Sequence, residues 1–258
     1  MQIAEPKVGR DARESRERSD EGEPVNDGTI SFEAVVLAGG NGSRFGADIP
    51  KQLINLAGQP ILYHTLRKFD LIPSVRRVVV AANTQFRPEI EMIARNALRF
   101  KKFEIVDGGD SRNQSVANSI STMNGPDDTH VLIHDGVRPL ANSELIELVN
   151  SALEHADAVV PVIPSADPLF VVDETEVTGF VDRAKVLRGQ SPQGFHLGQL
   201  RETFPPDGVS AEGYSTVFEE VHARYPGLRI ITVPGTLNNI KITTPLDRVI
   251  AGQLLLDE

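Results

Sequence analysis

Residues 34–52 read AVVLAGGNGSRFGADIPKQ and decide the fold. The stretch begins as an apolar run, breaks into glycines, and ends with a proline followed by a lysine. An apolar run of this length indicates a buried strand, and the glycines indicate a turn at the end of that strand. Such turns often bind phosphate, because backbone amides can approach an anion closely where no side chain intervenes.

Two common phosphate loops are excluded by spacing. The dinucleotide loop G-x-G-x-x-G, started at Gly40, requires a third glycine where a phenylalanine stands. The NTPase loop G-x-x-x-x-G-K-[ST] fails as well, because no glycine here is followed at the required distance by glycine and lysine. What remains is a set of close glycines, Gly39, Gly40 and Gly42, with two cations, Arg44 and Lys51. This pattern favours a triphosphate.

The composition indicates an acidic globular protein. Of its 258 residues 40% are hydrophobic, and the formal net charge is -10. This length suits one large α/β domain or two small ones, and the charge argues against a general nucleic-acid or membrane-surface binder. Without cysteine there are no disulfides or zinc-thiolate sites. No apolar run is long enough to span a bilayer, so we expect a cytoplasmic protein.

Short β-branched runs alternate with amphipathic segments along most of the chain. Residues 1–30 offer little to bury, so we expect a disordered tail before a single domain at 31–258. Strands are predicted at 33–38, 76–82, 103–107, 130–135, 157–163 and 229–234. Helices are predicted at 60–69, 89–100, 112–123 and 142–156, the last with Asn142 or Ser143 as N-cap. The alternation is typical of a doubly wound, Rossmann-like sheet in a three-layer α/β/α fold.

The segment 164–196 breaks this alternation. Two short alternating runs surround DETEVTG, residues 173–179. They predict a β-hairpin arm, at about 164–190, that projects from the sheet. Because a projecting hairpin usually packs on something, we expect this one to serve dimerisation.

Five motifs in order resemble a known enzyme family. LAGGNGSRFG and PKQLINLAGQPIL, within residues 37–62, are similar to the signature of nucleotidyltransferases that activate sugars and sugar alcohols. Later motifs narrow the resemblance to the cytidylyltransferases that act on 2-C-methyl-D-erythritol 4-phosphate and on ribitol 5-phosphate. These are VDGGDSRNQSV (106–116), IHDGVRPL (133–140), VDRAKVLRGQSPQGF (181–195) and NIKITTPLD (239–247). The resemblance covers about residues 33–255 and implies a nucleotidyltransferase fold, CTP as substrate, Mg²⁺ and a homodimer.

The reaction that the resemblance implies requires positioning and charge neutralisation. A phosphate oxygen of the second substrate attacks the α-phosphorus of CTP, and pyrophosphate leaves. A phosphate monoester has its second pKa at about 6, so at neutral pH it is already largely the dianion and needs no general base. Cationic side chains and a divalent ion suit this chemistry.

The resemblance implies roles for individual residues at the matching positions. Arg44 and Lys51 would clamp the triphosphate, with Lys51 essential, and Asp135 would help to hold Mg²⁺ through a carboxylate oxygen. Arg183 would reach the polyol phosphate in a neighbouring subunit's site, and Lys241 would meet the same phosphate. The implied CTP contacts are Leu37, Ala38, Gly39, Gly40, Gly42, Gly109, Asp110, Arg112, Ser115 and Asp135.

Without the resemblance, several of these residues have plainer interpretations. Asp135 would be a helix N-cap after its strand, and Arg138 would form a surface ion pair. GGDSRNQS would be a turn followed by an N-capped helix, which is compatible with a CTP site. His64 and His134 are interpreted as packing residues, because no partner set accompanies them.

Two positions depart from the family pattern. Val217 stands after Thr216 where an acid is expected, and Asn238 stands where some relatives have an acid. Glu219 or Glu220 would substitute one turn later, or else would lie on a solvated helix face. The departures leave open a homologue that binds nucleotide with weakened catalysis, and a nucleotidyltransferase that uses another NTP or sugar phosphate. LAGG, HDGVRP and RGQSPQ lean toward the ribitol branch, and the acceptor stays open between the two polyol phosphates.

Overall fold

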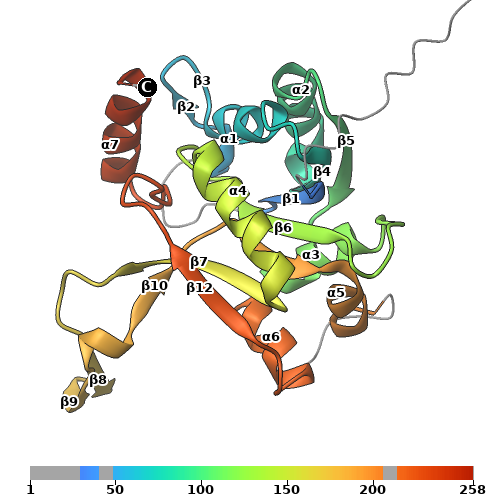
Figure 1. Cartoon of the computed structure of the whole chain (residues 1–258). Helices are drawn as coiled ribbons and strands as arrows, with labels where there is room; N and C mark the ends of the chain where they lie inside the picture. Colours follow the sequence, from blue (N-terminus) through green and yellow to red (C-terminus); the bar gives the residue numbers. More distant parts are fainter. Residues whose placement is uncertain (1–29, 41–48, 206–213, 258) are drawn as a thin grey trace, which may run out of the picture.

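The centre of the protein is one mixed sheet of eight strands (Figure 1). The computed structural model describes residues 30–40, 49–205 and 214–257. The strands of the sheet are β1 (Phe32–Ala38), β4 (Val75–Ala82), β5 (Lys102–Asp107), β6 (His130–Asp135), β7 (Ala158–Pro164), β10 (Leu187–Gly189), β11 (Gln193–His196) and β12 (Ile230–Pro234). Their order is β10-β7-β11-β6-β1-β4-β5, and β12 also pairs with β7. All six predicted strands are confirmed, with boundaries that agree to within one residue.

The quoted stretch begins in the central strand. β1 pairs in parallel with β4 and with β6, so that Val36 lies between Val80 and His134. Ala34 and Val36 face one hydrophobic core, whereas Val35 faces the other. Because side chains alternate across a strand, the continuous apolar run is explained by burial on both faces.

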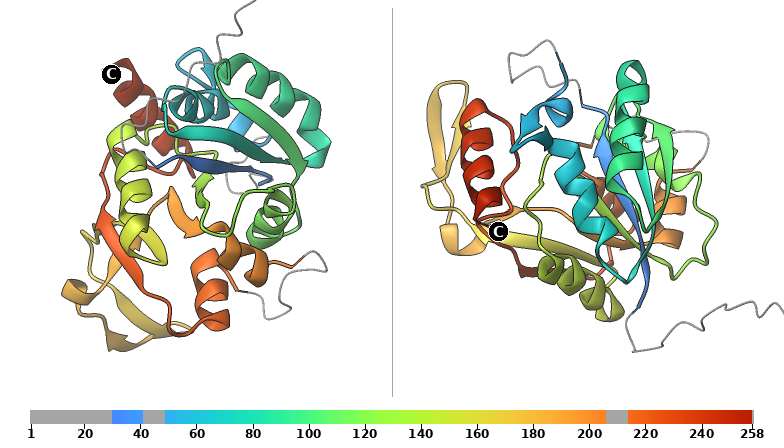
Figure 2. Two further views of the ribbon diagram at one scale, coloured as in Figure 1. Left: turned by 45° about the vertical axis from the view of Figure 1, so that its right-hand side comes forward. Right: turned by 90° about the horizontal axis from the view of Figure 1, so that it is seen from above.

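Helices cover both faces of the sheet (Figure 2). One face carries α1 (Ile61–Asp70), α2 (Arg87–Ala97) and α4 (Ser143–Ala152). The other carries α3 (Arg112–Ile120), α5 (Leu197–Thr203) and α6 (Val217–Arg224). The doubly wound three-layer fold is therefore confirmed. Asn142 is the N-cap of α4, and its side chain accepts a hydrogen bond from the Leu145 amide at 3.1 Å.

The helix predicted at 89–100 ends earlier, at Ala97. Leu98 leaves the helical conformation, with φ -94 and ψ 88. The next amides turn to the buried side chain of Asp70, whose Oδ1 accepts from Phe100 N at 2.8 Å and from Lys101 N at 3.2 Å. A carboxylate from another helix thus replaces the hydrogen bonds that would have continued α2.

The predicted hairpin is present and projects from the body of the molecule (Figure 1). It consists of β8 (Phe170–Asp173) and β9 (Glu176–Phe180), and the short helix η5 (Arg183–Lys185) follows it. We call residues 164–190 the arm. After the arm the chain returns through β10 and β11, which run antiparallel to β7. These two strands were not predicted, because they are short and are interrupted by the Ser191-Pro192 cis peptide bond.

The C-terminal helix α7 (Pro245–Leu256) closes a third, smaller core. Ala251 of α7 is buried there together with Leu56 of β2 (Asn55–Leu56). β2 forms a small hairpin with β3 (Gln59–Pro60), and the helix η2 (Lys51–Leu53) precedes it. Of the helices in the described residues, none has the length and apolarity needed to cross a membrane.

Candidate active site

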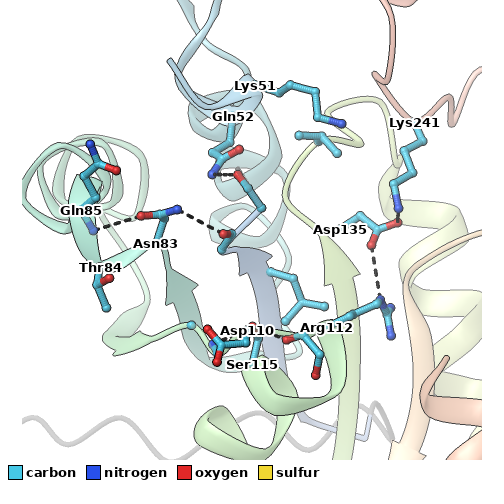
Figure 3. Close-up of a pocket in the computed structure, with 17 residues that line it drawn as sticks. Lys51, Gln52, Asn83, Thr84, Gln85, Asp110, Arg112, Ser115, Asp135 and Lys241 are labelled. Atoms are coloured by element: carbon cyan, nitrogen blue, oxygen red, sulfur yellow. Dashed lines mark hydrogen bonds and ion pairs between the residues drawn. The ribbon is translucent and has the colours of Figure 1, made fainter. Parts of the chain in front are cut away.

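A cavity of about 660 Å³ opens where four parallel strands end (Figure 3). β1, β4, β5 and β6 run in the same direction, so the residues that follow them meet at one edge of the sheet. The cavity is lined by Leu37, Gly39, Gly40, Lys51, Gln52, Asn83, Thr84, Gln85, Gly108, Gly109, Asp110, Ser111, Arg112, Ser115, Asp135, Val137 and Lys241. Its volume is in the range of sites for small molecules and cofactors.

Most of the residues predicted to form the site line this cavity. They are Leu37, Gly39, Gly40, Lys51, Gly109, Asp110, Arg112, Ser115, Asp135 and Lys241. Arg44 and Gly42 lie outside the described residues. Ala38 does not line the cavity, because its side chain is buried in the hydrophobic core. Arg183 lies on the arm, where its guanidinium donates to the Ala166 carbonyl at 3.0 Å, and it is not part of the cavity wall.

Asp135 is surrounded by three cations. Its Oδ2 lies 3.1 Å from Lys241 Nζ and 3.1 Å from Arg138 Nε, and its Oδ1 lies 3.8 Å from Arg112 Nε. Burial alone would raise the pKa of Asp135, but Lys241, Arg112 and Arg138 together hold it well below its ordinary range. The carboxylate is therefore ionised at neutral pH. The wall carries three cations, Lys51, Arg112 and Lys241, against two carboxylates, Asp110 and Asp135. Its charge balance is therefore positive, which favours an anionic ligand.

A buried hydrogen-bond network holds the end of β6. Burial lowers the pKa of the fully buried His134 to about 4, so the ring is neutral at pH 7. Its Nε2 lies 3.1 Å from the Arg138 carbonyl, which can only accept, so Nε2 carries the proton. Its Nδ1 then accepts from the Ser191 hydroxyl at 3.1 Å, and the Ser191 oxygen accepts from the Asp135 amide at 3.1 Å.

Two of the plainer interpretations are therefore wrong, and a third is incomplete. His134 does pack, with its ring centroid 5.3 Å from that of Phe69, but it also has the hydrogen-bond partners that the sequence did not show. Arg138 is buried, and it pairs with Asp135 instead of forming a surface ion pair. The N-cap of the following helix is Asn142, not Asp135. Ser191, the hydroxyl partner of His134, comes from a distant segment, and the burial that draws Arg138 onto nearby Asp135 depends on the whole fold, so the sequence did not reveal these contacts.

The start of α3 combines a helix cap with a pocket wall, as expected. The side chain of Ser111 caps the helix by accepting from Gln114 N at 3.0 Å. Ser115 Oγ accepts from Gly109 N at 3.0 Å, which ties the preceding turn to the helix. Burial lowers the pKa of Arg112, and nearby Asp135 opposes this shift.

Arg112 retains unused hydrogen-bonding capacity at the cavity. Its Nη2 donates to Gln193 Oε1 at 3.0 Å. Its buried Nη1 has no hydrogen-bond partner in the described part of the chain. Because a buried donor without an acceptor is costly, this guanidinium is suited to an anionic or carbonyl oxygen of a ligand.

The two departures from the family pattern do not face the cavity. Val217 is buried in the core under α6, and Asn238 is exposed in a turn. Glu219 forms a capping box with Thr216. Glu220 is 4% exposed and its Oε2 accepts from Asn113 Nδ2 at 2.5 Å, so its placement on a solvated face is wrong. Neither glutamate supplies an acid to the cavity wall.

The carboxylates of the cavity fit a metal ion only together with a ligand. Asp135 and Asp110 are the acidic residues in the wall. Across residues 30–40, 49–205 and 214–257, no group of three or more His, Cys, Asp or Glu could hold a metal ion. Mg²⁺ commonly takes one or two carboxylates and completes its shell with substrate phosphates and water. The donor set here fits that arrangement.

Several cavity residues were missed by the sequence analysis. They are Gln52, Asn83, Thr84, Gln85, Gly108, Ser111 and Val137. Asn83, Thr84 and Gln85 follow β4 directly. Because ligands bind at the carboxyl ends of parallel strands, these three residues could have been predicted from the sequence. Gln52 had a weaker signal, as a polar residue next to the predicted Lys51.

Comparison with known proteins agrees with the five motifs. The sequence model of the family described as 2-C-methyl-D-erythritol 4-phosphate cytidylyltransferase matches residues 32–257. The protein of that name from Rubrobacter xylanophilus is 37% identical over 224 residues, covering 86% of this chain and 94% of the relative. The one from Cereibacter sphaeroides is 36% identical over 224 residues, covering 86% and 96%.

Solved structures give the same result for the fold. The crystal structure of 2-C-methyl-D-erythritol 4-phosphate cytidylyltransferase from Francisella tularensis has a TM-score of 0.70 and 27% sequence identity. The match covers 86% of this chain and 99% of that one. With sequence, fold and motif order in agreement over almost the whole described chain, this protein belongs to the 2-C-methyl-D-erythritol 4-phosphate cytidylyltransferase family of CTP-dependent nucleotidyltransferases.

Proposed function

We propose that this enzyme transfers CMP from CTP to 2-C-methyl-D-erythritol 4-phosphate, giving the CDP-alcohol and pyrophosphate. The relatives described above carry this acceptor in their names. The structural observation that carries the proposal is the convergence of Lys51, Arg112 and Lys241 on a cavity that also contains Asp135. Such a site suits the several anionic groups of two phosphorylated substrates.

In our proposal the triphosphate lies against the glycine turn and Lys51. Gly39 and Gly40 allow close approach of the backbone, and Lys51 adds a full charge beside them. The cytosine and ribose lie against Gly109, Asp110 and Ser115 on the other side of the cavity, where short side chains leave room. Arg44 would add a second cation to the triphosphate side.

In the proposed complex the acceptor phosphate lies near Lys241. Arg183 of the partner subunit contacts the same phosphate. Lys241 is 42% exposed at its side chain, so it can reach a second ligand. Arg183 does not line the cavity of its own chain, which favours a role in a neighbouring site. The arm also exposes Val171, Val172 and Phe180, the last at 82%, and a homodimer would bury these apolar side chains.

The chemical step is an in-line displacement at phosphorus. A dianionic phosphate oxygen of the acceptor forms a bond to the α-phosphorus, and the bond to the pyrophosphate oxygen breaks. Lys51 neutralises charge that develops on the phosphoryl oxygens. Asp135, together with triphosphate oxygens, would hold Mg²⁺, which when bound neutralises further phosphate charge. We also propose a cytoplasmic location, which the lack of cysteine supports.

Pyrophosphate release tests the proposal. The enzyme with Mg²⁺ is given each of the four NTPs, with 2-C-methyl-D-erythritol 4-phosphate or ribitol 5-phosphate as acceptor. We expect release with CTP and the methylerythritol phosphate. Faster release with ribitol 5-phosphate, or with another NTP, would overturn the proposed substrate. Calorimetric binding of CTP without release on either acceptor would instead identify a homologue that binds nucleotide only.

A further inference from the structure

Two buried glutamines each bridge backbone groups beside one lysine of the cavity. Gln52, 2% exposed, directly follows Lys51, and Gln190, 4% exposed, contacts the segment that leads to Lys241. We propose that they are positioning residues for separate halves of the site, Gln52 for the triphosphate half and Gln190 for the acceptor half. This inference rests on the proposed function.

Gln52 joins η2 to the end of β1. Its Nε2 donates to the carbonyl oxygen of Ala38 at 2.6 Å. It also donates to the carbonyl oxygen of Gly40 at 3.1 Å (Figure 3). Both hydrogens of the amide are thereby used, and both bonds run to the turn that precedes residue 41. The backbone that carries Lys51 is therefore attached directly to the backbone of Gly40, and the two phosphate-binding elements cannot shift independently.

The hydrogen bonds from Gln52 also make the glycine turn more favourable for an anion, because they engage its carbonyl oxygens. The Leu37 carbonyl accepts from Gly136 N at 2.9 Å, and the Gly39 carbonyl accepts from Asn83 Nδ2 at 3.4 Å. With the two bonds from Gln52, four successive carbonyl oxygens at the end of β1 each have a donor. Carbonyl oxygens repel phosphate, so keeping them engaged favours an anion at this turn. Gln52 supplies two of these donors without adding charge.

Gln190 does the equivalent for the segment that precedes Lys241. Its Nε2 donates to the carbonyls of Thr236 at 2.9 Å and Asn239 at 3.3 Å. Its Oε1 accepts from Thr236 N at 3.2 Å and Asn239 Nδ2 at 3.4 Å. Residues 235–241 contain no strand or helix, so the side-chain amide of Gln190 fixes the backbone that leads to Lys241. Gly235 leaves the room for it, since a Cβ there would lie 2.5 Å from Gln190 Oε1.

Glutamate is the informative substitution at both positions. It has nearly the same shape, but it has no hydrogens to donate and would bring a carboxylate toward two carbonyl oxygens. Gln52→Glu should therefore disturb the backbone beside Lys51, whereas Gln190→Glu should disturb the backbone before Lys241. Gln52→Met and Gln190→Met remove the donors without adding charge, and they serve if a glutamate variant does not fold. Gln59→Glu, at an exposed position on β3, is the matched control.

Steady-state kinetics with both substrates varied tests the assignment. We expect Gln52→Glu to raise the KM for CTP by about tenfold or more, with the acceptor KM within about twofold, and Gln190→Glu to do the reverse. Thermal unfolding of each variant accompanies the kinetics. Equal effects of both variants on the two KM values, or wild-type KM values in both, would overturn the inference.

Calorimetry separates this inference from the proposed function. A wild-type enzyme that releases no pyrophosphate would overturn the proposed function, whatever the glutamines do. In that case CTP affinity still tests Gln52, and affinity for inorganic phosphate still tests Gln190. CTP should bind at least about tenfold more weakly to Gln52→Glu than to Gln190→Glu, and inorganic phosphate should show the opposite order. Equal affinities would overturn the inference.

Discussion

Lys241 Nζ lies 3.1 Å from Asp135 Oδ2, and this ion pair joins the end of β6 to the segment before α7. Arg138 Nε lies 3.1 Å from the same oxygen. The two cations differ in exposure, since the Lys241 side chain is 42% exposed and that of Arg138 is 11% exposed. Lys241 can therefore turn toward a ligand phosphate while Arg138 continues to neutralise Asp135.

This difference predicts separate effects of two substitutions. Arg138→Ala should lower the free energy of unfolding by about 3 kcal/mol or more, because it breaks a buried pair and a bond to the Asn239 carbonyl. Lys241→Ala should change it by less than about 1 kcal/mol, since that pair is partly exposed, and should lower turnover. Urea unfolding and pyrophosphate release measure the two effects. Equal destabilisation would show that Lys241 is a structural cation too.

Lys51→Ala tests the triphosphate side. Loss of a cation that stabilises the transferring phosphoryl group should lower kcat/KM by about a hundredfold or more, without unfolding the protein. Lys102→Ala, an exposed lysine on β5, is the control and should retain activity. Near-normal pyrophosphate release from Lys51→Ala, with an unchanged circular dichroism spectrum, would contradict the mechanism.

The proposed homodimer predicts complementation between inactive chains. If Arg183 serves the partner's site, a mixed dimer of a Lys51→Ala chain and an Arg183→Ala chain contains one site with both residues intact. Unfolding and refolding an equal mixture should therefore restore about a quarter of wild-type activity. No recovery, with dimers present in sedimentation velocity, would show that each site uses its own Arg183. A Phe180→Glu variant should weaken the dimer.

His134 predicts a pH dependence of stability. Burial lowers its pKa from 6.5 to about 4, so between these values the unfolded state binds a proton that the folded state does not. The unfolded state is then favoured as pH falls, and this group alone should remove about 3 kcal/mol between pH 6.5 and 4. Urea unfolding of His134→Gln should show a shallower loss over this range. His222→Gln, at an exposed position, should keep the wild-type slope, and equal slopes for all three would contradict the prediction.

Gly136 predicts a steric requirement behind the cavity. Its amide donates to the Leu37 carbonyl at 2.9 Å, and a Cβ at this position would lie 2.8 Å from that same oxygen. Gly136→Ala should therefore lower the free energy of unfolding by about 1–3 kcal/mol. Gly227→Ala is the control, since a Cβ there meets nothing within 4 Å. Equal urea midpoints for the two variants would contradict this explanation.

The local pattern predicted most of the body of the fold. Continuous apolar runs such as Val35–Leu37 mark strands buried on both faces, and the glycines mark where the first strand ends. These signals depend on near neighbours in sequence, so they could be read directly. β10 and β11 gave no such signal, because short strands on either side of Ser191-Pro192 show no periodicity. That β11 lies antiparallel between β6 and β7, and that β10 pairs antiparallel with β7, became visible only in the structure.

For the candidate site, too, some features were predicted from the sequence and others became visible only in the structure. The sequence by itself determined the glycine turn, Lys51, the arm and the family, because the spacing of nearby residues carries that information. Only the tertiary structure decided that Asp135 is shared by Arg112, Arg138 and Lys241. It also decided that Gln52 and Gln190 are buried amides rather than surface side chains. Burial and charge pairing are produced by segments that are distant in sequence and meet only when the sheet forms, so no local pattern encodes them.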